Sequence, residues 1–443
     1  MLKAGVISLG CVKNLVDTEV MLGILRENKI DVTAQPNDAD IIIINTCTFI
    51  ESAKEEAIST ILQMADFKIS GKCRGIIVAG CLGQRYKQEL LDELPEVDAI
   101  IGTGAWDRIM EAVEAVLAGE RLIIADKSEI IYDDKMPRIL TTPRYTAYVK
   151  VAEGCDNRCA YCVIPLVRGN FRSRTIESIV AETKNLVKNG VKEINLIAQD
   201  TTNYGIDLYG EIKILDLLKE LVKIEELKWI RLLYCYPKRF TDELLNFMAT
   251  EPKICKYIDL PLQHAHNDVL KAMARQDTKE EIEDLLVRIR KIMPTATIRT
   301  SFIVGFPGES IEHYETLKEF IIKQRFDKVG IFTYSKEEDT VAFTMEQQVS
   351  EEIKQERYHE LMAIQSKISE EINQSLEDQE LEVLIEGRDS EQENVTYGRS
   401  YREAQEIDGQ VYVENDPDSM PGQFIKTKVV QGYTYDILAE KIK

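Results

Sequence analysis

The feature that most constrains the fold of this chain is a repeated alternation of short apolar strands with amphipathic helices. In the first 118 residues, each apolar run of strand length is followed by a helical pattern. Such alternation favours a mostly parallel, doubly wound α/β sheet, because a helix normally makes the crossover between parallel strands. The expected strands are 4–10, 38–46, 73–80 and 97–104.

The alternation resumes after residue 143 and predicts a central domain over residues 144–349. Six strand-like runs fall short of the eight that close a (β/α)8 barrel. We therefore expect an open, six-stranded (β/α) partial TIM barrel, with its chemistry at the carboxyl ends of the strands. The expected strands are 145–154, 192–200, 229–236, 256–264, 297–306 and 327–335.

Three further segments complete the predicted organisation. The N-terminal domain, 1–118, is followed by a linker, 119–143, which carries mixed charge and two prolines. Residues 350–375 contain no Gly or Pro and predict a single polar connecting helix. From 376 to 443, short strands separated by turn residues predict a small antiparallel β-barrel of the oligonucleotide-binding-like kind.

Three cysteines stand directly after three of the expected N-terminal strands. Cys11, Cys47 and Cys81 form what we call the N-terminal cysteine group. The carboxyl ends of parallel strands meet at one edge of a sheet, so these thiols are expected to converge there. We interpret them as a metal site rather than as small buried residues. The cysteines that lack such a pattern, and are predicted to be structural, are Cys73, Cys235 and Cys255.

A second group lies in "CDNRCAYC", with the spacing C-x3-C-x2-C after the first central strand. Cys155, Cys159 and Cys162 form the loop cysteine group. A closed zinc site would need four ligands, and no fourth is evident nearby. Three thiolates on a four-iron cluster leave one iron open, which can bind the amine and carboxylate of S-adenosylmethionine (SAM). The spacing favours a SAM-binding cluster, with a cysteine-rich zinc loop as the alternative.

With Tyr161 before its last cysteine, this motif resembles the signature of radical SAM enzymes. The order of the three domains is similar to that of the methylthiotransferases, whose C-terminal barrel is called the TRAM domain. Within that family, "SLGCVKNLVDTEVM", "LIAQDTTNYGIDLYG" and "FIVGFPGES" resemble the RimO-type enzymes. The tRNA-modifying branch differs after its first cysteine and has a more basic barrel. Val12 departs from the pattern, which has proline there.

The resemblance implies a transferase that inserts a methylthio group at the β-carbon of an aspartate in the twelfth protein of the small ribosomal subunit. The implied cofactors are SAM and two 4Fe–4S clusters. The loop cysteine group would hold the SAM-binding cluster, and the N-terminal cysteine group an auxiliary cluster suited to carrying sulfide or methylsulfide. An electron donor such as flavodoxin or ferredoxin is implied as a partner. The alternative activity is tRNA-adenosine methylthiotransfer.

Other polar residues are weaker candidates for SAM contacts. Gln199 and Asp200 end the second central strand, and a plain strand-end turn is the alternative for both. His264, near His266, closes the fourth strand and could equally make structural hydrogen bonds. Tyr161, Ile303 and Gly305 complete the predicted SAM contacts. The arginines that could recognise carboxylates of SAM or substrate, or form a solvated basic loop, are Arg168, Arg172 and Arg174.

Charge points to a protein partner rather than to nucleic acid. The formal net charge is −21, and residues 376–443 carry 16 acidic and 7 basic side chains. Such a barrel repels phosphate backbones and should attract a basic ribosomal protein. We expect reversal of Glu403, Glu406 and Asp408 to weaken this docking, provided that they are exposed. No export signal and no membrane-length apolar run are evident, which favours the cytoplasm and no membrane contact.

Overall fold

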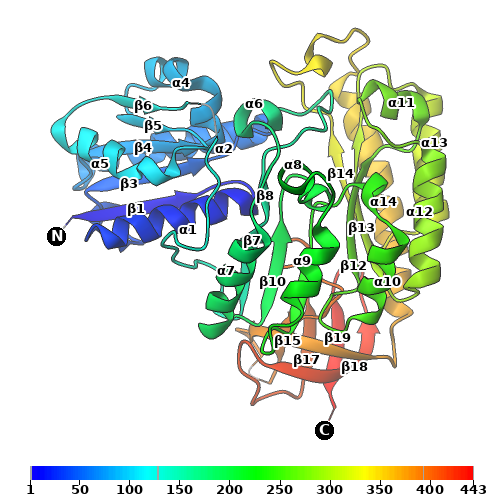
Figure 1. Cartoon of the computed structure of the whole chain (residues 1–443). Coiled ribbons are helices and arrows are strands. Elements are labelled where there is room, and N and C mark those ends of the chain that lie inside the picture. The colour runs from blue at the N-terminus through cyan, green and yellow to red at the C-terminus, as the bar shows by residue number, and fades with distance from the viewer. Residues whose placement is uncertain (1, 127–128, 393, 443) are drawn as a thin grey trace.

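The structure, a computed structural model, describes residues 2–126, 129–392 and 394–442. In Figure 1 the N-terminal sheet lies beside the central domain, and the small C-terminal barrel lies against one end of the central strands. Within the described residues, no helix combines the length and the apolarity that a bilayer crossing requires.

The N-terminal domain is a six-stranded parallel sheet with the order β2-β1-β3-β4-β5-β6, so the predicted doubly wound sheet is confirmed. Its continuous isoleucine run is buried on both faces. Ile41 and Ile43 pack with residues of α1 and α5, whereas Ile42 and Ile44 pack with α2 and α4. The elements are β1 (Lys3–Ser8), α1 (Val12–Glu27), β2 (Asp31–Thr33), β3 (Ile41–Thr46), α2 (Glu51–Ala65), α3 (Phe67–Ser70), β4 (Gly75–Gly80), α4 (Cys81–Glu93), β5 (Ala99–Ile101), α5 (Ile109–Ala118) and β6 (Leu122–Ile124).

Two edge strands of this sheet were not expected from the sequence. β2 pairs with β1, and β6 pairs with β5 inside the range that we assigned to the linker. Each has three residues, which is too short to show an alternation of polar and apolar side chains. The connection to the central domain therefore begins after residue 124, not at 119.

The central domain contains the six predicted parallel strands as an open partial barrel. They form two three-stranded sheets, β11-β10-β7 and β12-β13-β14, joined where the Cys255 amide donates to the Ile230 carbonyl at 3.0 Å. The strands are β7 (Thr146–Lys150), β10 (Glu193–Ile197), β11 (Trp229–Leu232), β12 (Tyr257–Gln263), β13 (Thr297–Val304) and β14 (Lys328–Thr333), with the short pair β8 (Ala152–Glu153) and β9 (Arg172–Ser173). The helices are α6 (Ile164–Arg168), α7 (Ile176–Lys188), α8 (Ile206–Tyr209), α9 (Ile214–Leu221), α10 (Asp242–Thr250), α11 (Asn267–Ala272), α12 (Lys279–Ile292) and α13 (Ile311–Gln324).

The connecting helix α14 (Glu351–Gln374) is amphipathic in its packing rather than uniformly polar. Leu361 and Ile368 are buried in the core of the central domain, and Gln365 donates to the Phe326 carbonyl at 2.8 Å. The helix thus packs against β14 and α13 and also contacts β18 of the C-terminal barrel.

The C-terminal domain is a closed barrel with the strand order β15-β16-β17-β19-β18. Four of its pairings are antiparallel, as predicted, but β17 and β19 pair in parallel. β18 lies between β17 and β19 in the chain, so the parallel pair joins strands that are not consecutive, and local sequence patterns do not reveal such a pairing. The strands are β15 (Glu380–Arg388), β16 (Thr396–Arg399), β17 (Val411–Glu414), β18 (Phe424–Gly432) and β19 (Ile437–Lys441).

This barrel docks on the amino ends of the central strands through buried charges. Glu193, the first residue of β10, pairs with Arg399 at 2.6 Å and with Arg231 at 3.3 Å. Tyr257, the first residue of β12, donates to Asp408 at 2.7 Å. The carboxyl ends of the central strands, on the opposite side, remain available for chemistry.

Candidate functional site

The N-terminal cysteine group converges, as predicted, at the carboxyl edge of the N-terminal sheet. Cys11 precedes the first turn of α1, Cys47 follows β3, and Cys81 begins α4 after Gly80. Gly10 and Gly80 both have positive φ, and a β-carbon on Gly10 would lie 2.7 Å from the β-carbon of Cys47. Glycine before each helix thus lets the loops approach closely enough to bring the thiols together.

The loop cysteine group lies in the segment after β8, and main-chain hydrogen bonds hold this segment in place. The Cys155 amide donates to the Gly169 carbonyl at 3.2 Å, and the Ala160 amide donates to the Met273 carbonyl at 2.9 Å. Asn157 also donates to Asp200 at 2.9 Å. The loop is therefore fixed before any metal binds.

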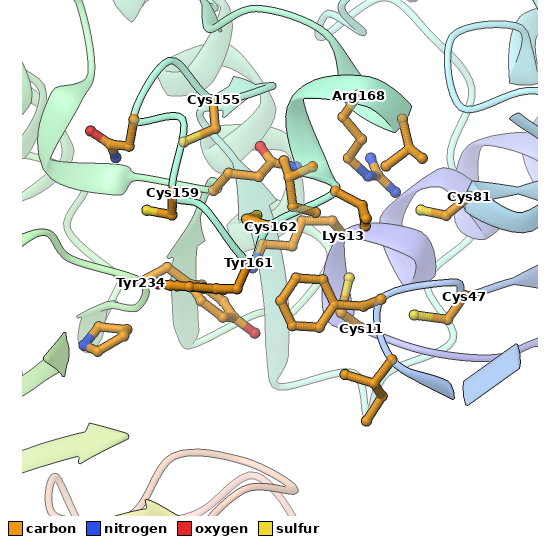
Figure 2. A pocket seen from close by; sticks show the side chains of 18 of the residues that line it. Cys11, Lys13, Cys47, Cys81, Cys155, Cys159, Tyr161, Cys162, Arg168 and Tyr234 are labelled. Atoms are coloured by element: carbon orange, nitrogen blue, oxygen red, sulfur yellow. The ribbon is translucent and has the colours of Figure 1, made fainter. Parts of the chain in front are cut away.

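Both cysteine groups line one cavity of about 400 Å³ between the two domains (Figure 2). All nine cysteines of the chain are unpaired thiols. Burial raises the pKa of Cys81 to about 12 and that of Cys155 to about 11. These thiols therefore keep their protons until a bound cation displaces them.

The donor set fits iron–sulfur clusters better than single zinc ions. Two sulfur ligands on one zinc ion lie at most about 4.6 Å apart. In the described residues, the three sulfur atoms of neither group all come within 4.8 Å of one another. Cysteines that bind different irons of one cluster are not held to this limit, and three thiolates would leave the fourth iron of a 4Fe–4S cluster open to another ligand. In the described residues, neither group is thus arranged as a preformed three-sulfur site for one zinc ion.

The two domains are held together beneath the cavity by a buried network of charges. Asp17 of α1 pairs with Lys150 and, at 3.1 Å, with Arg168 of the central domain. Glu153 pairs with the same two cations at 2.7 and 2.9 Å. Gln199 donates to Glu153 at 2.8 Å. This network fixes the separation of the two cysteine groups.

The arginines after the loop group do not have the role expected from the sequence. Arg168 is 1% exposed and belongs to the charge network, so it is neither a solvated residue nor available for a ligand carboxylate. Arg174 is buried against Glu182 at 2.5 Å, and Arg172 donates to the Asn170 carbonyl at 2.8 Å. Asp17, which pairs with Arg168, lies 151 residues away in the sequence, so local reasoning could not identify it.

The structure divides the weaker SAM candidates into two sets. Tyr161 and Gln199 line the cavity, and Ile303 lines an adjoining cavity of about 670 Å³ that shares Tyr161 with the first. The other three candidates are engaged in hydrogen bonds within the protein. Asp200 accepts from Asn157 in the segment of the loop cysteine group, and Nδ1 of His264 accepts from the His266 amide. The Gly305 amide donates to Glu309.

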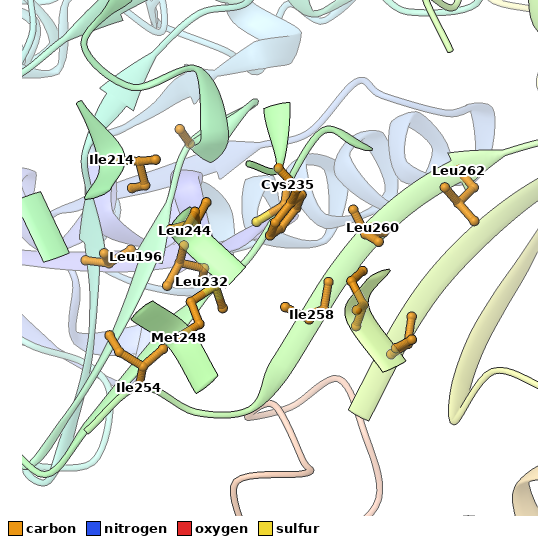
Figure 3. Packing of buried hydrophobic residues seen from close by; sticks show 14 of the residues in the cluster. Leu196, Ile214, Leu232, Cys235, Leu244, Met248, Ile254, Ile258, Leu260 and Leu262 are labelled. Carbon is orange, nitrogen blue, oxygen red and sulfur yellow. The ribbon is translucent and has the colours of Figure 1, made fainter. Parts of the chain in front are cut away.

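Several cavity residues were not identified from the sequence. Lys13 lies in the first turn of α1, where burial lowers its pKa to about 7. Tyr234 and Gln263 have φ values of 61° and 71°, a conformation rare in residues other than glycine and typical of functional sites. Cys235, predicted to be structural, follows β11 and also lines the cavity, although Figure 3 shows it among the apolar side chains of the barrel core.

Comparisons with known proteins agree with this architecture. Residues 3–102 match the uncharacterized protein family UPF0004, residues 149–321 the radical SAM superfamily, and residues 379–442 the TRAM domain. The radical S-adenosylmethionine methyltransferase TsrM from Kitasatospora setae shares the fold with a TM-score of 0.56 and 14% identity, over 75% of this chain and 73% of that one. The chain is therefore a radical SAM protein, and this class implies a 4Fe–4S cluster and SAM as cofactors.

Its relatives define the family more narrowly. Proteins named ribosomal protein uS12 methylthiotransferase RimO are 53% identical in Desulforamulus reducens, over 98% of each chain, and 49% identical in Heliobacterium modesticaldum, over 100% of this chain and 95% of that one. The chain belongs to the RimO family. These relatives do not favour the tRNA-modifying alternative.

Proposed function

We propose that this chain is a methylthiotransferase that replaces one hydrogen at the β-carbon of an aspartate in ribosomal protein uS12 with a methylthio group. The observation that carries the proposal is the convergence of both cysteine groups on one cavity. A site that must both remove a hydrogen and deliver sulfur needs its two centres to face one carbon atom. The names of the relatives support uS12 as the substrate.

The loop cysteine group would hold the SAM-binding cluster, and the N-terminal cysteine group would hold an auxiliary cluster. When bound, these cofactors supply reductive cleavage of one SAM to a carbon radical, a carrier for sulfur, and a methyl group from a second SAM. The hydrogen from the substrate would leave in 5′-deoxyadenosine, beside methionine and S-adenosylhomocysteine. The sulfur would enter as sulfide, and the electron released when the carbon–sulfur bond forms would return to the iron–sulfur cofactor. The electron that cleaves SAM comes from a small donor such as flavodoxin or ferredoxin.

The residues of the chain itself provide a dry, rigid setting for this chemistry. Phe49, Ile50, Val163 and Val167 contribute apolar side chains to the cavity wall, which limits the access of water to a reactive radical. Tyr161 and Gln199 lie at the loop cysteine group, where we propose that they contact SAM. The buried charge network keeps both groups at a fixed separation.

We further propose that the net negative charge of the C-terminal barrel attracts the basic substrate protein. Glu403 is 1% exposed and Asp408 contacts Tyr257, so these two residues belong to the contact with the central domain and cannot test docking. The exposed acidic residues on this barrel, and in the segment just before β15, include Glu377, Glu380, Glu382, Glu391, Asp418 and Glu440. Opposite charges would speed the encounter with the substrate.

The test is modification of a uS12 peptide by the anaerobically reconstituted, reduced enzyme. With SAM labelled in its methyl group, the label should appear in the peptide, whose mass should rise by one methylthio group less one hydrogen. Fragmentation should place the change on the aspartate. Label found in tRNA, with an unmodified peptide, would contradict the proposal. Free thiols and a ribosomal substrate would suit a reducing cytoplasm, which we propose as the location of this activity.

A further inference from the structure

Lys13 occupies an unusual position between the two cysteine groups. It lies two residues after Cys11, is only 5% exposed, and lines the shared cavity. Its Nζ atom lies over the ring of Tyr234, 2.7 Å from the ring centroid. Figure 2 shows it between the cysteines of the N-terminal domain and those of the loop. A buried ammonium group is costly unless an anion accompanies it.

The charges around the cavity leave this cation without a carboxylate. Three cations line the cavity, and two of them are already paired within the protein: Arg168 with Asp17 and Glu153, and Arg275 with Asp277 at 3.2 Å. For Lys13, no carboxylate of the described residues lies within 4.0 Å. The described lining of the cavity also contains no Asp or Glu side chain. An anion that enters the cavity would meet a lysine side chain that has no carboxylate partner within ion-pair distance among the described residues.

We propose that Lys13 binds the side-chain carboxylate of the substrate aspartate and so selects aspartate for modification. This inference rests on the proposed function. The carbon that reacts is bonded directly to the carboxylate carbon, so a held carboxylate also fixes the β-carbon. Because Lys13 lies between the two cysteine groups, its position suits a carbon that must meet both. Tyr234 would hold the ammonium group in the empty site by a cation–π contact and keep it directed into the cavity.

The test compares two peptides, one with the target aspartate and one with asparagine, in the wild-type enzyme and in Lys13→Gln. The wild type should prefer aspartate by about a hundredfold in kcat/KM, because a buried cation is left unpaired by the neutral amide. Lys13→Gln should lose about a hundredfold on aspartate and should lose the preference as well. Lys13→Arg, which keeps the charge, should keep the preference at a lower rate. The matched control is Lys188→Gln, on an exposed turn of α7.

Two further readouts make each outcome decisive. Iron content establishes cluster loading, and 5′-deoxyadenosine formed without peptide measures SAM cleavage, which Lys13→Gln should retain. If SAM cleavage is lost with full iron, the lysine serves SAM and the proposal is wrong. If Lys13→Gln does not load iron, the wild type and Lys13→Arg provide the test instead. Equal rates on the aspartate and asparagine peptides in these two proteins would refute the proposal. A wild type that modifies neither peptide refutes the proposed function instead.

Discussion

The Asp17→Asn substitution should disturb the position of the two clusters relative to each other without impairing SAM cleavage. Asp17 is 5% exposed and pairs across the domain boundary with Lys150 and Arg168, which are each 1% exposed. Removing one partner of a buried ion pair costs about 3–5 kcal/mol. Glu153 stays bonded to both cations, so we expect the lower end, about 3 kcal/mol. That is about a hundredfold shift toward separated domains.

The assay follows the two activities in the same preparation. Asp17→Asn should load iron and cleave SAM normally, because the loop cysteine group and its hydrogen bonds lie in the central domain. Methylthio transfer should fall, and protease should cut the 125–143 segment faster. Asp31→Asn, on the exposed edge strand β2, is the matched control. Unchanged transfer and unchanged proteolysis in Asp17→Asn would refute the view that this network sets the separation of the clusters.

Three other predictions concern the clusters, the interface with the C-terminal barrel, and docking. Reconstituted protein should carry about eight irons, and replacing all three cysteines of either group with Ala should leave about four. Only the variant without the loop cysteine group should lose SAM cleavage. Eight irons in either variant would contradict the assignment of one cluster to each cysteine group. Burial alone would raise the pKa of Glu193, but Arg399 and Arg231 hold it below its usual range. The stability that it contributes is thus present above the unfolded-state pKa of about 4.3 and is lost as the pH falls below it. Glu193→Gln should destabilise the protein at pH 7 and flatten its pH dependence below about pH 4 in urea titrations; a parallel pH profile would count against this pairing. Reversal of charge at the exposed residues Glu391, Glu406 and Asp418 should weaken uS12 binding at low salt and reduce its salt dependence, whereas the same number of reversals at Glu27, Glu114 and Glu120 should not. Equal effects of the two sets would exclude specific docking on the barrel.

The sequence was sufficient to predict those features that depend on local periodicity or on strand-end position. The apolar run at residues 38–46 predicted a strand of a doubly wound sheet, and the positions after β1, β3 and β4 predicted the meeting of three thiols. The radical SAM motif pointed to the remaining three. No distance between the two groups follows from such patterns, because the domains are brought together by residues far apart in the sequence, such as Asp17 and Lys150.

The same limit explains the errors. Arg168 looked like a ligand-binding residue because its partners, Asp17 and Glu153, are not local to it. The prediction that Cys235 is structural is not contradicted, because this residue lies in the apolar core, although its position after β11 also brings it to the cavity wall. Lys13 was overlooked because a single lysine at the start of a helix is ordinary in sequence. Its burial and its lack of a carboxylate partner become visible only when both domains are assembled.

The position of the C-terminal barrel sets a fixed distance between a protein bound to the barrel and the cavity. The barrel contacts the amino ends of the central strands, whereas the cavity lies at their carboxyl ends. β12 and β13, with 7 and 8 residues, span the intervening distance, which is about 25 Å. A protein held on the barrel can reach the cavity only through a segment of about seven or more extended residues. Substrates would thus be sorted by the spacing between the anchored surface and the modified residue, and peptides with a shortened spacer should gain nothing from the barrel.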